Sequence, residues 1–307
     1  MTIDAVLIAG PTASGKSRAA LVLADAIGGA VINADSMQVY RETRILTARP
    51  TDADTATAPH LLYGHVSVTE TYSVGRYQAE AAHALRTARE SGRVPIFCGG
   101  TGMYFGVLTE GIANIPAVPA GVREQVRQRR EAIGAEAFHA ELAMRDPAAA
   151  SRLRASDTQR TLRAYEVFEA TGRPLSQWQS EMGAPLLGGM SLARFVLSPP
   201  RDVLRERIDA RFDAMMASGA LAEAHALEGV ALSPTASKII GLRELQSADA
   251  GEITPDEAST RAKAASRQYG KRQLTWFRQR MAGWDWIEAQ ELSNILPVMM
   301  ARLNENA

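Results

Sequence analysis

Residues 5–17 read AVLIAGPTASGKS, and this short segment carries the strongest fold signal in the chain. Its first residues are consecutively apolar, a pattern typical of a strand buried on both faces. Gly10–Ser17 then matches the phosphate-loop pattern G-x-x-x-x-G-K-[ST] at every fixed position, and an alanine- and leucine-rich helical segment follows. A strand, this loop and a helix predict the first βα unit of a parallel α/β sheet.

The same loop predicts a binding site for a diphosphate or triphosphate. Glycines let backbone N–H groups turn toward phosphate oxygens, and the N-terminus of the next helix adds a partial positive charge. We expect Lys16 to neutralise phosphate charge and the Ser17 hydroxyl to be a ligand of Mg²⁺, the predicted cofactor. The predicted diphosphate-binding residues are Gly10, Pro11, Thr12, Ala13, Ser14, Gly15, Lys16 and Ser17.

Further strand-like runs alternate with helical segments and extend the predicted sheet. They lie at residues 30–34, 94–100, 193–198 and 284–287. Polar clusters follow two of them, DSMQVYR at 35–41 and GGTGMY at 99–104. Because ligand groups collect at the carboxyl ends of parallel strands, we expect Asp35 and Thr101 to share a crevice with the phosphate loop. Taken singly, Asp35 as a helix cap and Thr101 as a turn hydroxyl remain alternatives.

Residues 113–189 have a different pattern from the sequence around them. They begin with Pro116 and Pro119, end in a glycine pair, and are polar and helical between, with ten Lys/Arg against nine Asp/Glu. We predict a helical domain, residues 113–189, inserted into a phosphate-loop α/β core of residues 1–112 plus 190–307.

Composition excludes several classes of protein. The 307 residues include 34 Lys+Arg and 34 Asp+Glu, so binding of nucleic acid through bulk charge is excluded while a local basic face is not. The single cysteine, Cys98, excludes a disulfide framework and a multi-cysteine zinc site, and it favours a reducing, cytoplasmic location. Apolar runs are far shorter than the roughly 20 residues that span a bilayer, and we expect neither a signal peptide nor a membrane partner.

Positive charge is concentrated near the end of the chain. Residues 261–280 contain seven Lys/Arg and no Asp/Glu, with Tyr269, Trp276 and Phe277 among them. We expect the basic side chains, Lys263, Arg267, Lys271 and Arg278 included, to contact RNA, and Trp276 and Phe277 to pack in the core. Arginines of the predicted insertion offer a second basic surface.

Five separated blocks resemble the tRNA dimethylallyltransferases, also called tRNA isopentenyltransferases or the IPP transferase family. In the family's order they are Gly10–Ser17, Asp35–Arg41, Tyr72–Val74, Gly99–Tyr104 and Arg267–Arg278. The chain departs from the family pattern at 42–50, at His60, which stands alone where a pair is common, and at Leu242, where tyrosine is usual. None of these positions lies in the phosphate loop or at Asp35.

The resemblance implies transfer of a dimethylallyl group from dimethylallyl diphosphate to the exocyclic N6 amine of the adenosine that is 3′-adjacent to the anticodon in tRNA. The residues suit this chemistry, because an adenine amine is a weak nucleophile and Asp35 is placed to accept its proton. We therefore expect Asp35, Lys16 and Thr101 to be catalytic, and Asp35, Ser36, Met37 and Gln38 to contact the flipped base. By resemblance, the further residues that contact tRNA are Thr101, Arg123, Gln159, Arg160, Thr161, Leu162 and Arg163. The expected partners are the anticodon stem-loop and dimethylallyl diphosphate, with the protein a monomer.

Two other functions share some of these features. A nucleotide or small-molecule kinase would also have an ATP-binding phosphate loop and an arginine-bearing lid. A nucleotide-switch module would need a guanine-reading motif such as N-K-x-D, which the sequence lacks. The 35–38 segment and the basic 261–280 helix favour RNA modification over both.

Overall fold

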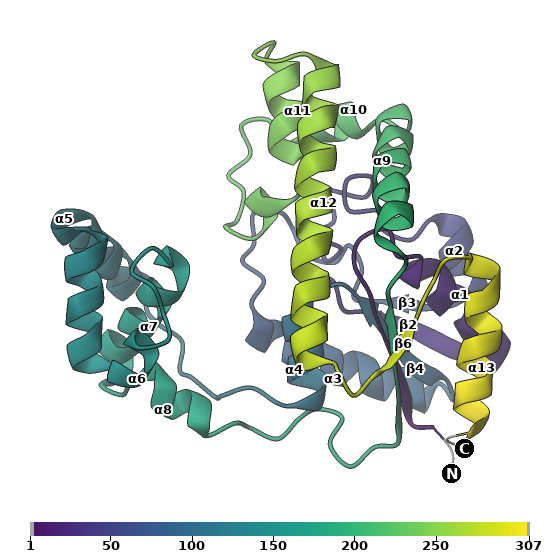
Figure 1. Ribbon diagram of the computed structural model, residues 1–307, viewed down its shortest axis with the longest axis horizontal. Coiled ribbons are helices and arrows are strands. Elements are labelled where there is room, and N and C mark those ends of the chain that lie inside the picture. The colour runs from purple at the N-terminus through teal and green to yellow at the C-terminus, as the bar shows by residue number, and fades with distance from the viewer. Residues whose placement is uncertain (1–2, 306–307) are drawn as a thin grey trace. The chain divides into compact units, whose positions relative to one another are not determined.

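The computed structural model describes residues 3–305 and divides the chain into two compact units (Figure 1). The first comprises the residues up to Phe105 together with those from Gly189 onward, and the second is Gly106–Gly188. The first unit contains a parallel sheet with helices on both faces, so the predicted α/β fold class is confirmed.

The sheet has six parallel strands in the order β3-β2-β4-β1-β5-β6. The central strand β1 pairs on one side with β4 and on the other with β5, with Val6 opposite Ile96 and Ala193. Every residue of β1 is buried, as its uninterrupted apolar run predicts, and every residue of β2 is buried as well. The strands are β1 (Ala5–Ala9), β2 (Gly29–Asn33), β3 (His60–Leu61), β4 (Val94–Gly99), β5 (Leu192–Leu197) and β6 (Asp285–Ile287).

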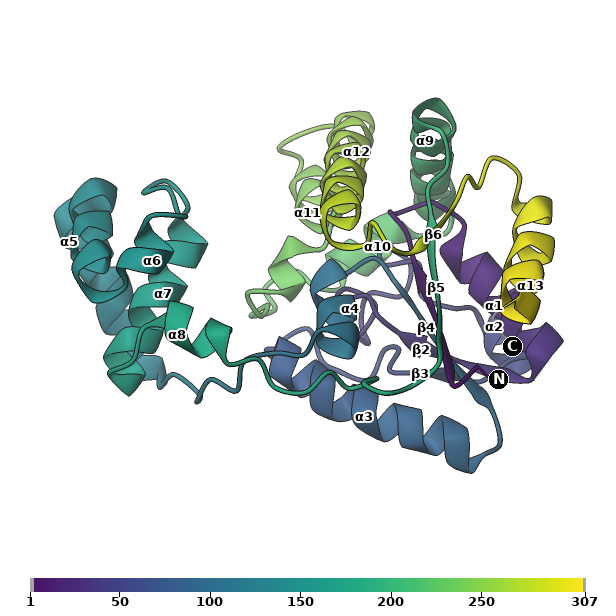
Figure 2. The ribbon, with the colours of Figure 1, turned by 60° about the horizontal axis from the view of Figure 1, so that its bottom comes forward.

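Helices cover the two faces of the sheet (Figure 2). On one face α1 (Lys16–Ile27) and α13 (Ile295–Glu305) form a core with Val6 and Ile8 of β1. Successive side chains of a strand alternate between faces, so Leu7 points to the other face, where α3 (Val74–Glu90) packs on β2 and β4. Gly28, in the left-handed conformation, ends α1 and leads directly into β2.

A layer of helices follows β5, and within it α12 (Pro255–Arg280) lies beside α9 (Arg201–Ala217) and α11 (Leu242–Asp249) (Figure 1). Thr254 and Glu257 form a capping box that begins α12. The other elements of this unit are α2 (Asp52–Thr57), α10 (Ala220–His225) and the 3₁₀ helices η1 (Ala236–Lys238) and η2 (Leu292–Asn294). Helix α4 (Gly102–Thr109) begins in the first unit and ends in the second.

The second unit consists mainly of helices around a small core of its own. Phe138 and Tyr165 stack in this core with ring centroids 4.5 Å apart, and Leu142 and Val167 are buried beside them. Helix α5 bends at Gly134, whose φ of 81° lies in the left-handed region. The helices are α5 (Ala120–Arg145), α6 (Pro147–Ala150), α7 (Thr158–Thr171) and α8 (Leu175–Ser180).

Among residues 3–305, no helix combines the length and the apolar character that crossing a membrane requires.

Candidate active site

The phosphate loop connects the central strand β1 to α1 and folds tightly on itself. Gly15 and Ala13 both take left-handed backbone angles, with φ of 89° and 61°. A Cβ at Gly10 would lie 2.5 Å from the Ser14 Oγ and 3.1 Å from the Leu197 carbonyl oxygen, so glycine gives the loop the room it takes here. The loop therefore surrounds a small space at the N-terminus of α1, which is the geometry that binds phosphate groups.

Lys16 is the buried cation of this loop. Its Nζ donates a hydrogen bond to the Pro11 carbonyl at 3.2 Å. Burial lowers the pKa of Lys16, and the nearby Asp35 carboxylate opposes that shift. The Ser14 Oγ is also buried, and within the described residues it has no hydrogen-bond partner. A desolvated ammonium and an unsatisfied hydroxyl in one cradle suit an incoming anion.

Asp35 follows β2 and is held by its own turn. The Asn33 side chain accepts a hydrogen bond from the Asp35 N–H at 2.8 Å and donates to the Asp35 carbonyl at 2.9 Å. The Asp35 Oδ1 accepts the Met37 N–H at 3.0 Å, whereas Oδ2 lies 3.2 Å from the position of a Cβ at Gly100. One oxygen thus stabilises the turn, and the other points toward the loop after β4.

Thr101 lies beside this turn because the ends of β2 and β4 are adjacent. Its N–H donates to the Ala34 carbonyl at 3.2 Å, and its Oγ1 accepts the Ser36 N–H at 2.9 Å. A Cβ at Gly99 would lie 2.0 Å from the Ala34 carbonyl oxygen, so glycine permits this close approach of the two backbones. The structure therefore brings the Asp35 and Thr101 segments into direct contact at one edge of the sheet.

A cavity of about 420 Å³ is lined by both the phosphate loop and the Asp35 turn. Its polar wall includes Lys16, Ser17, Asp35 and the side chain of Tyr269, which is in hydrogen-bond contact with Thr101. Its apolar wall comes mainly from α9 and the segments at 46–48 and 239–240. The apolar lining residues are Met37, Leu46, Ile208, Phe212, Met215, Ile239 and Ile240.

Two arginines of α9 line the same cavity, and the sequence analysis did not identify them. Arg211 is half-buried at the cavity wall. Desolvation of its guanidinium lowers its pKa, and Asp35 again opposes the shift. Arg207 donates to the Ala289 and Gln290 carbonyls at 3.0 and 2.7 Å. Their spacing of four residues, on a helix that follows a strand next to β1, is the signal that could have identified them.

The segment at 42–50, where the chain departs from the family pattern, forms part of the cavity wall. The Gln38 side chain donates to the carbonyls of Thr47 and Ala48 at 2.9 and 2.8 Å. From the other side, the Glu223 carboxylate accepts the backbone N–H groups of Ile45 and Leu46 at 2.7 and 2.8 Å. Gln38 therefore supports this wall, and its contact with a base remains a prediction.

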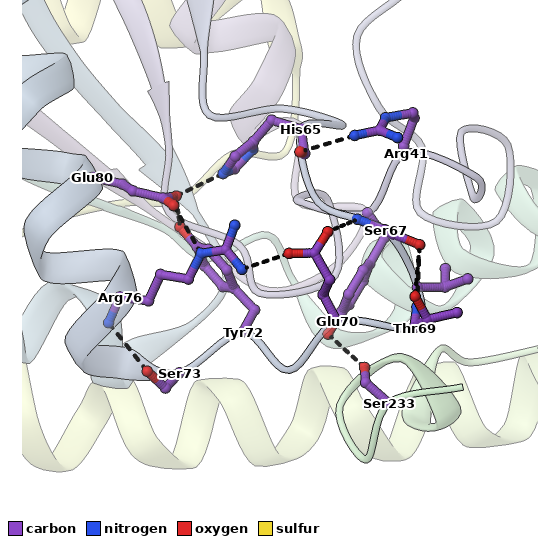
Figure 3. A network of polar contacts seen from close by, with 12 residues as sticks. Arg41, His65, Ser67, Thr69, Glu70, Tyr72, Ser73, Arg76, Glu80 and Ser233 are labelled. Atoms are coloured by element: carbon purple, nitrogen blue, oxygen red, sulfur yellow. Dashed lines mark hydrogen bonds and ion pairs between the residues drawn. The ribbon is translucent and has the colours of Figure 1, made fainter. Parts of the chain in front are cut away.

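A network of polar contacts reaches Arg41, the last residue of the Asp35–Arg41 segment (Figure 3). Its centre is Glu80 of α3, which accepts hydrogen bonds from Tyr72, Arg76 and His65 at 2.7, 2.9 and 2.7 Å. Burial works to raise the pKa of Glu80, but these three donors outweigh it and lower the pKa. The His65 carbonyl in turn accepts the Arg41 side chain at 3.2 Å. Through His65, Glu80 and its partner Tyr72 are thus connected to Arg41.

The predicted tRNA-contacting residues of the second unit fall into exposed and buried sets. Arg123 of α5 and Gln159 and Arg160 of α7 are exposed. Thr161 is buried and donates to the carbonyls of Asp157 and Thr158 at 2.9 and 3.1 Å. Leu162 packs against the core of this unit, and Arg163 is half-buried, which lowers its pKa. The side chains of Thr161 and Leu162 are therefore used inside the unit. RNA contact by Arg123, Gln159, Arg160 and Arg163 remains a prediction.

The basic residues of α12 also divide into two sets. Lys263 and Arg267 form ion pairs with Asp213 and Asp209 of α9, so they hold α9 and α12 together. Lys271 is exposed instead and lines an open groove. The residues that share this groove with it are Gln268, Arg272, Thr275, Trp276 and Gln279. Phe277 is fully buried, as predicted for a core aromatic. Trp276 packs over Gly102 but is only partly buried, because it also lines the groove.

The fold and the site together define a class: a phosphate-loop α/β protein whose anion cradle opens into a cavity that contains a carboxylate and an apolar wall. The model of the IPP transferase family matches residues 38–280. The chain belongs to this family.

Similar sequences and solved structures support the assignment. A tRNA dimethylallyltransferase of a Bradyrhizobium strain is 52% identical over 289 residues, covering 94% of this chain and 95% of the relative. The tRNA isopentenylpyrophosphate transferase of Bacillus halodurans superposes with a TM-score of 0.69 at 31% identity, covering 99% of this chain and 98% of the other. A eukaryotic dimethylallyltransferase, solved acting on tRNA, gives a TM-score of 0.81 at 26% identity over 94% of this chain and 75% of its own.

Proposed function

We propose that this chain transfers a dimethylallyl group from dimethylallyl diphosphate to the N6 amine of the adenosine 3′-adjacent to the anticodon in tRNA, with release of diphosphate. One observation carries the proposal: a single cavity contains the phosphate loop, the Asp35 carboxylate and an apolar wall. A prenyl diphosphate has an anionic end and an apolar end. The acceptor amine attacks the carbon where the two ends join, and a base near that carbon must take the proton of the amine. The names of the relatives point to the same reaction.

The phosphate loop provides the leaving-group end of the reaction. The C–O bond to diphosphate breaks as the amine attacks, so negative charge develops on the bridging oxygen. Lys16 and Arg211 line this end of the cavity. Desolvation lowers the pKa of both, because it removes the water that would stabilise their positive charge. A bound anion would stabilise that charge instead. We assign them to stabilise the departing diphosphate.

Mg²⁺ fits the oxygen donors at this end. The Ser17 hydroxyl and the Asp35 carboxylate both line the cavity beside the cradle, and hard oxygen ligands are those that Mg²⁺ prefers. We propose that Ser17 holds the ion together with the diphosphate oxygens. The ion, when bound, neutralises charge on the leaving group.

Asp35 is assigned as the general base. The amine nitrogen bonds to the allylic carbon and loses a proton, and the Asp35 Oδ2, which is directed toward the loop after β4, is placed to accept it. Thr101 lies within hydrogen-bond reach of Ser36 and in contact with Tyr269, so it is placed to orient the adenine base.

We further propose that the exposed residues Arg123, Gln159 and Arg160, with Lys271, contact the tRNA stem-loop, and that the protein acts as a cytoplasmic monomer.

The test is to incubate the protein and tRNA with dimethylallyl diphosphate carrying carbon-14 in its prenyl group, or with ATP labelled at the γ-phosphate. We expect the prenyl label alone to appear in RNA, in a single N6-modified adenosine after nuclease digestion. The reaction should stop when Mg²⁺ is chelated and resume when it is restored. Label from ATP in RNA or in a small molecule would instead support a kinase.

A further inference from the structure

Three side chains of one helix meet three consecutive residues of the loop after β4. Tyr269, Gln273 and Trp276 are spaced four and three residues apart, so they lie on one face of α12. Tyr269 is in hydrogen-bond contact with Thr101. A Cβ added to Gly100 would lie 2.2 Å from the Gln273 Nε2, and a Cβ added to Gly102 would lie 2.3 Å from the Trp276 ring. The glycines thus make room for this face of the helix.

Gln273 also reaches the phosphate loop. Its Oε1 accepts the Thr12 N–H at 2.9 Å, and its Nε2 donates to the Gly100 carbonyl at 2.8 Å. The side chain is 6% exposed, and both hydrogen bonds are buried. One amide therefore connects two loops that are about 90 residues apart in the chain, and each loop supplies one end of the proposed reaction.

We propose that Gln273 is a positioning residue: its amide sets the distance between the diphosphate cradle and the loop that carries Thr101, so that leaving group and amine face each other. The inference rests on the proposed function and adds to it a residue that touches neither substrate. Glutamine is required because the bridge needs an acceptor toward Thr12 and a donor toward Gly100 in one planar group. A displacement of about 1 Å between reacting groups can lower a rate by about 10²-fold.

Gln273→Glu tests this inference through pH. A carboxylate at position 273 can still accept the hydrogen bond from the Thr12 N–H. Its second oxygen, however, faces the Gly100 carbonyl oxygen, and the two acceptors repel each other. A protonated Glu restores the O–H donor toward Gly100. Burial raises the pKa of such a carboxyl above its ordinary value of about 4.3. At saturating substrates we expect a single-turnover rate at least tenfold below the parent at pH 8, with the ratio to the parent rising as the pH is lowered to 6. Gln78→Glu in α3 is the charge-matched control, expected to follow the parent.

A double-mutant cycle separates positioning from simple support of the fold. Gln273→Met removes both hydrogen bonds, and Gly100→Ala places a Cβ where the amide lies. Because each breaks the same bridge, we expect the double variant to lose no more rate than about the larger single loss, with thermal unfolding used to confirm that each variant is folded.

Three results would overturn the inference: a Gln273→Glu profile parallel to that of the parent, a Gln273→Met rate within twofold of it, or losses that multiply in the double variant. Should Gln273→Glu not fold, Gln273→Met and the cycle decide. If the parent itself transfers no dimethylallyl group, the proposed function fails; if the parent is active and the variants match it, only the role of Gln273 fails.

Discussion

Asp35 uses its two carboxylate oxygens differently, and this difference allows its role as a base to be separated from its role in the turn. In Asp35→Asn the amide oxygen still accepts the Met37 N–H, so the turn is kept, but the side chain no longer takes a proton. We expect near-normal binding of both substrates and a chemical step slower by about 10²–10⁴-fold. Single-turnover rates with pre-bound tRNA measure that step, and a rate within a few-fold of the parent would remove Asp35 from the mechanism.

Lys16 should make diphosphate binding depend on pH. Burial lowers its pKa in the free protein, and a bound anion raises it again. At a pH between the pKa of free Lys16 and its pKa in the complex, binding of diphosphate takes up a proton. The affinity for diphosphate therefore falls as the pH rises above the pKa of free Lys16, which is lower than the 10.5 of an ordinary lysine. Calorimetry of inorganic diphosphate in buffers of different ionisation enthalpy measures this uptake. Lys16→Met should bind more weakly and lose that part of the uptake; equal uptake in both proteins contradicts the assignment.

The local residues of the site are those that the sequence could predict. A phosphate loop is one contiguous segment, so Gly10–Ser17 identifies itself without knowledge of the fold. Arg211 lines the cavity and Gln273 hydrogen-bonds to the phosphate loop at Thr12, yet both come from helices far along the chain. Only the tertiary fold brings them to this loop. Neither residue type, taken alone, separates such a role from that of an ordinary surface side chain.

At the scale of elements, α12 provides a direct comparison between two basic residues on one helix. Arg267 is paired with Asp209, whereas Lys271 is exposed in the open groove. We expect Lys271→Gln to reduce the log–log salt slope of tRNA binding by about one, as loss of one phosphate contact does. Arg267→Gln should leave that slope unchanged while lowering thermal stability. Filter binding over a range of salt concentrations checks both predictions. A reduced slope for Arg267→Gln with an unchanged slope for Lys271→Gln would mean that Arg267, and not Lys271, contacts RNA.

Helices α10 and α11 are linked by an exposed pair. The His225 Nδ1 and the Asp249 Oδ2 are 2.5 Å apart, and this hydrogen bond raises the pKa of His225 above 6.5. The contribution of the pair to stability is therefore complete below the unfolded pKa and is lost as the pH rises through the folded value. We expect NMR titration to place His225 above 6.5 and Asp249→Asn to lower its midpoint. An unchanged midpoint would mean that the pair does not form in solution.

The strands found from sequence are those with several apolar residues close together, the WDWI segment of β6 included. Strands β1, β2 and β4 each present at least four buried residues in succession, and the structure places them within a residue of the predicted bounds. Strand β3 has two residues, both only partly buried, and no hydrophobic pattern could reveal it. The cavity wall at 42–50 lies outside regular secondary structure, and hydrogen bonds to Gln38 and Glu223 hold it in place. A hydrophobic pattern in the sequence therefore could not predict this wall either.

At the scale of the whole molecule, each of the two compact units encloses a hydrophobic core of its own. Phe138 is fully buried in the core of the helical unit, and Phe195 of β5 is fully buried in the core of the sheet. Truncating either leaves a cavity, and such changes cost about 3–5 kcal/mol of unfolding free energy. The two positions therefore allow the units to be weakened one at a time.

We expect Phe138→Ala to weaken tRNA binding while the affinity for inorganic diphosphate stays within about twofold, because the phosphate loop belongs to the sheet unit. Phe195→Ala is the matched comparison: it removes the same ring from the strand beside β1 and should lower the affinity for diphosphate. Calorimetry with diphosphate, filter binding with tRNA and thermal unfolding are compared for the two variants. Equal loss of diphosphate affinity in both would show that the cradle depends on the folding of the helical unit, and the placement of the diphosphate site within the sheet unit alone would then fail.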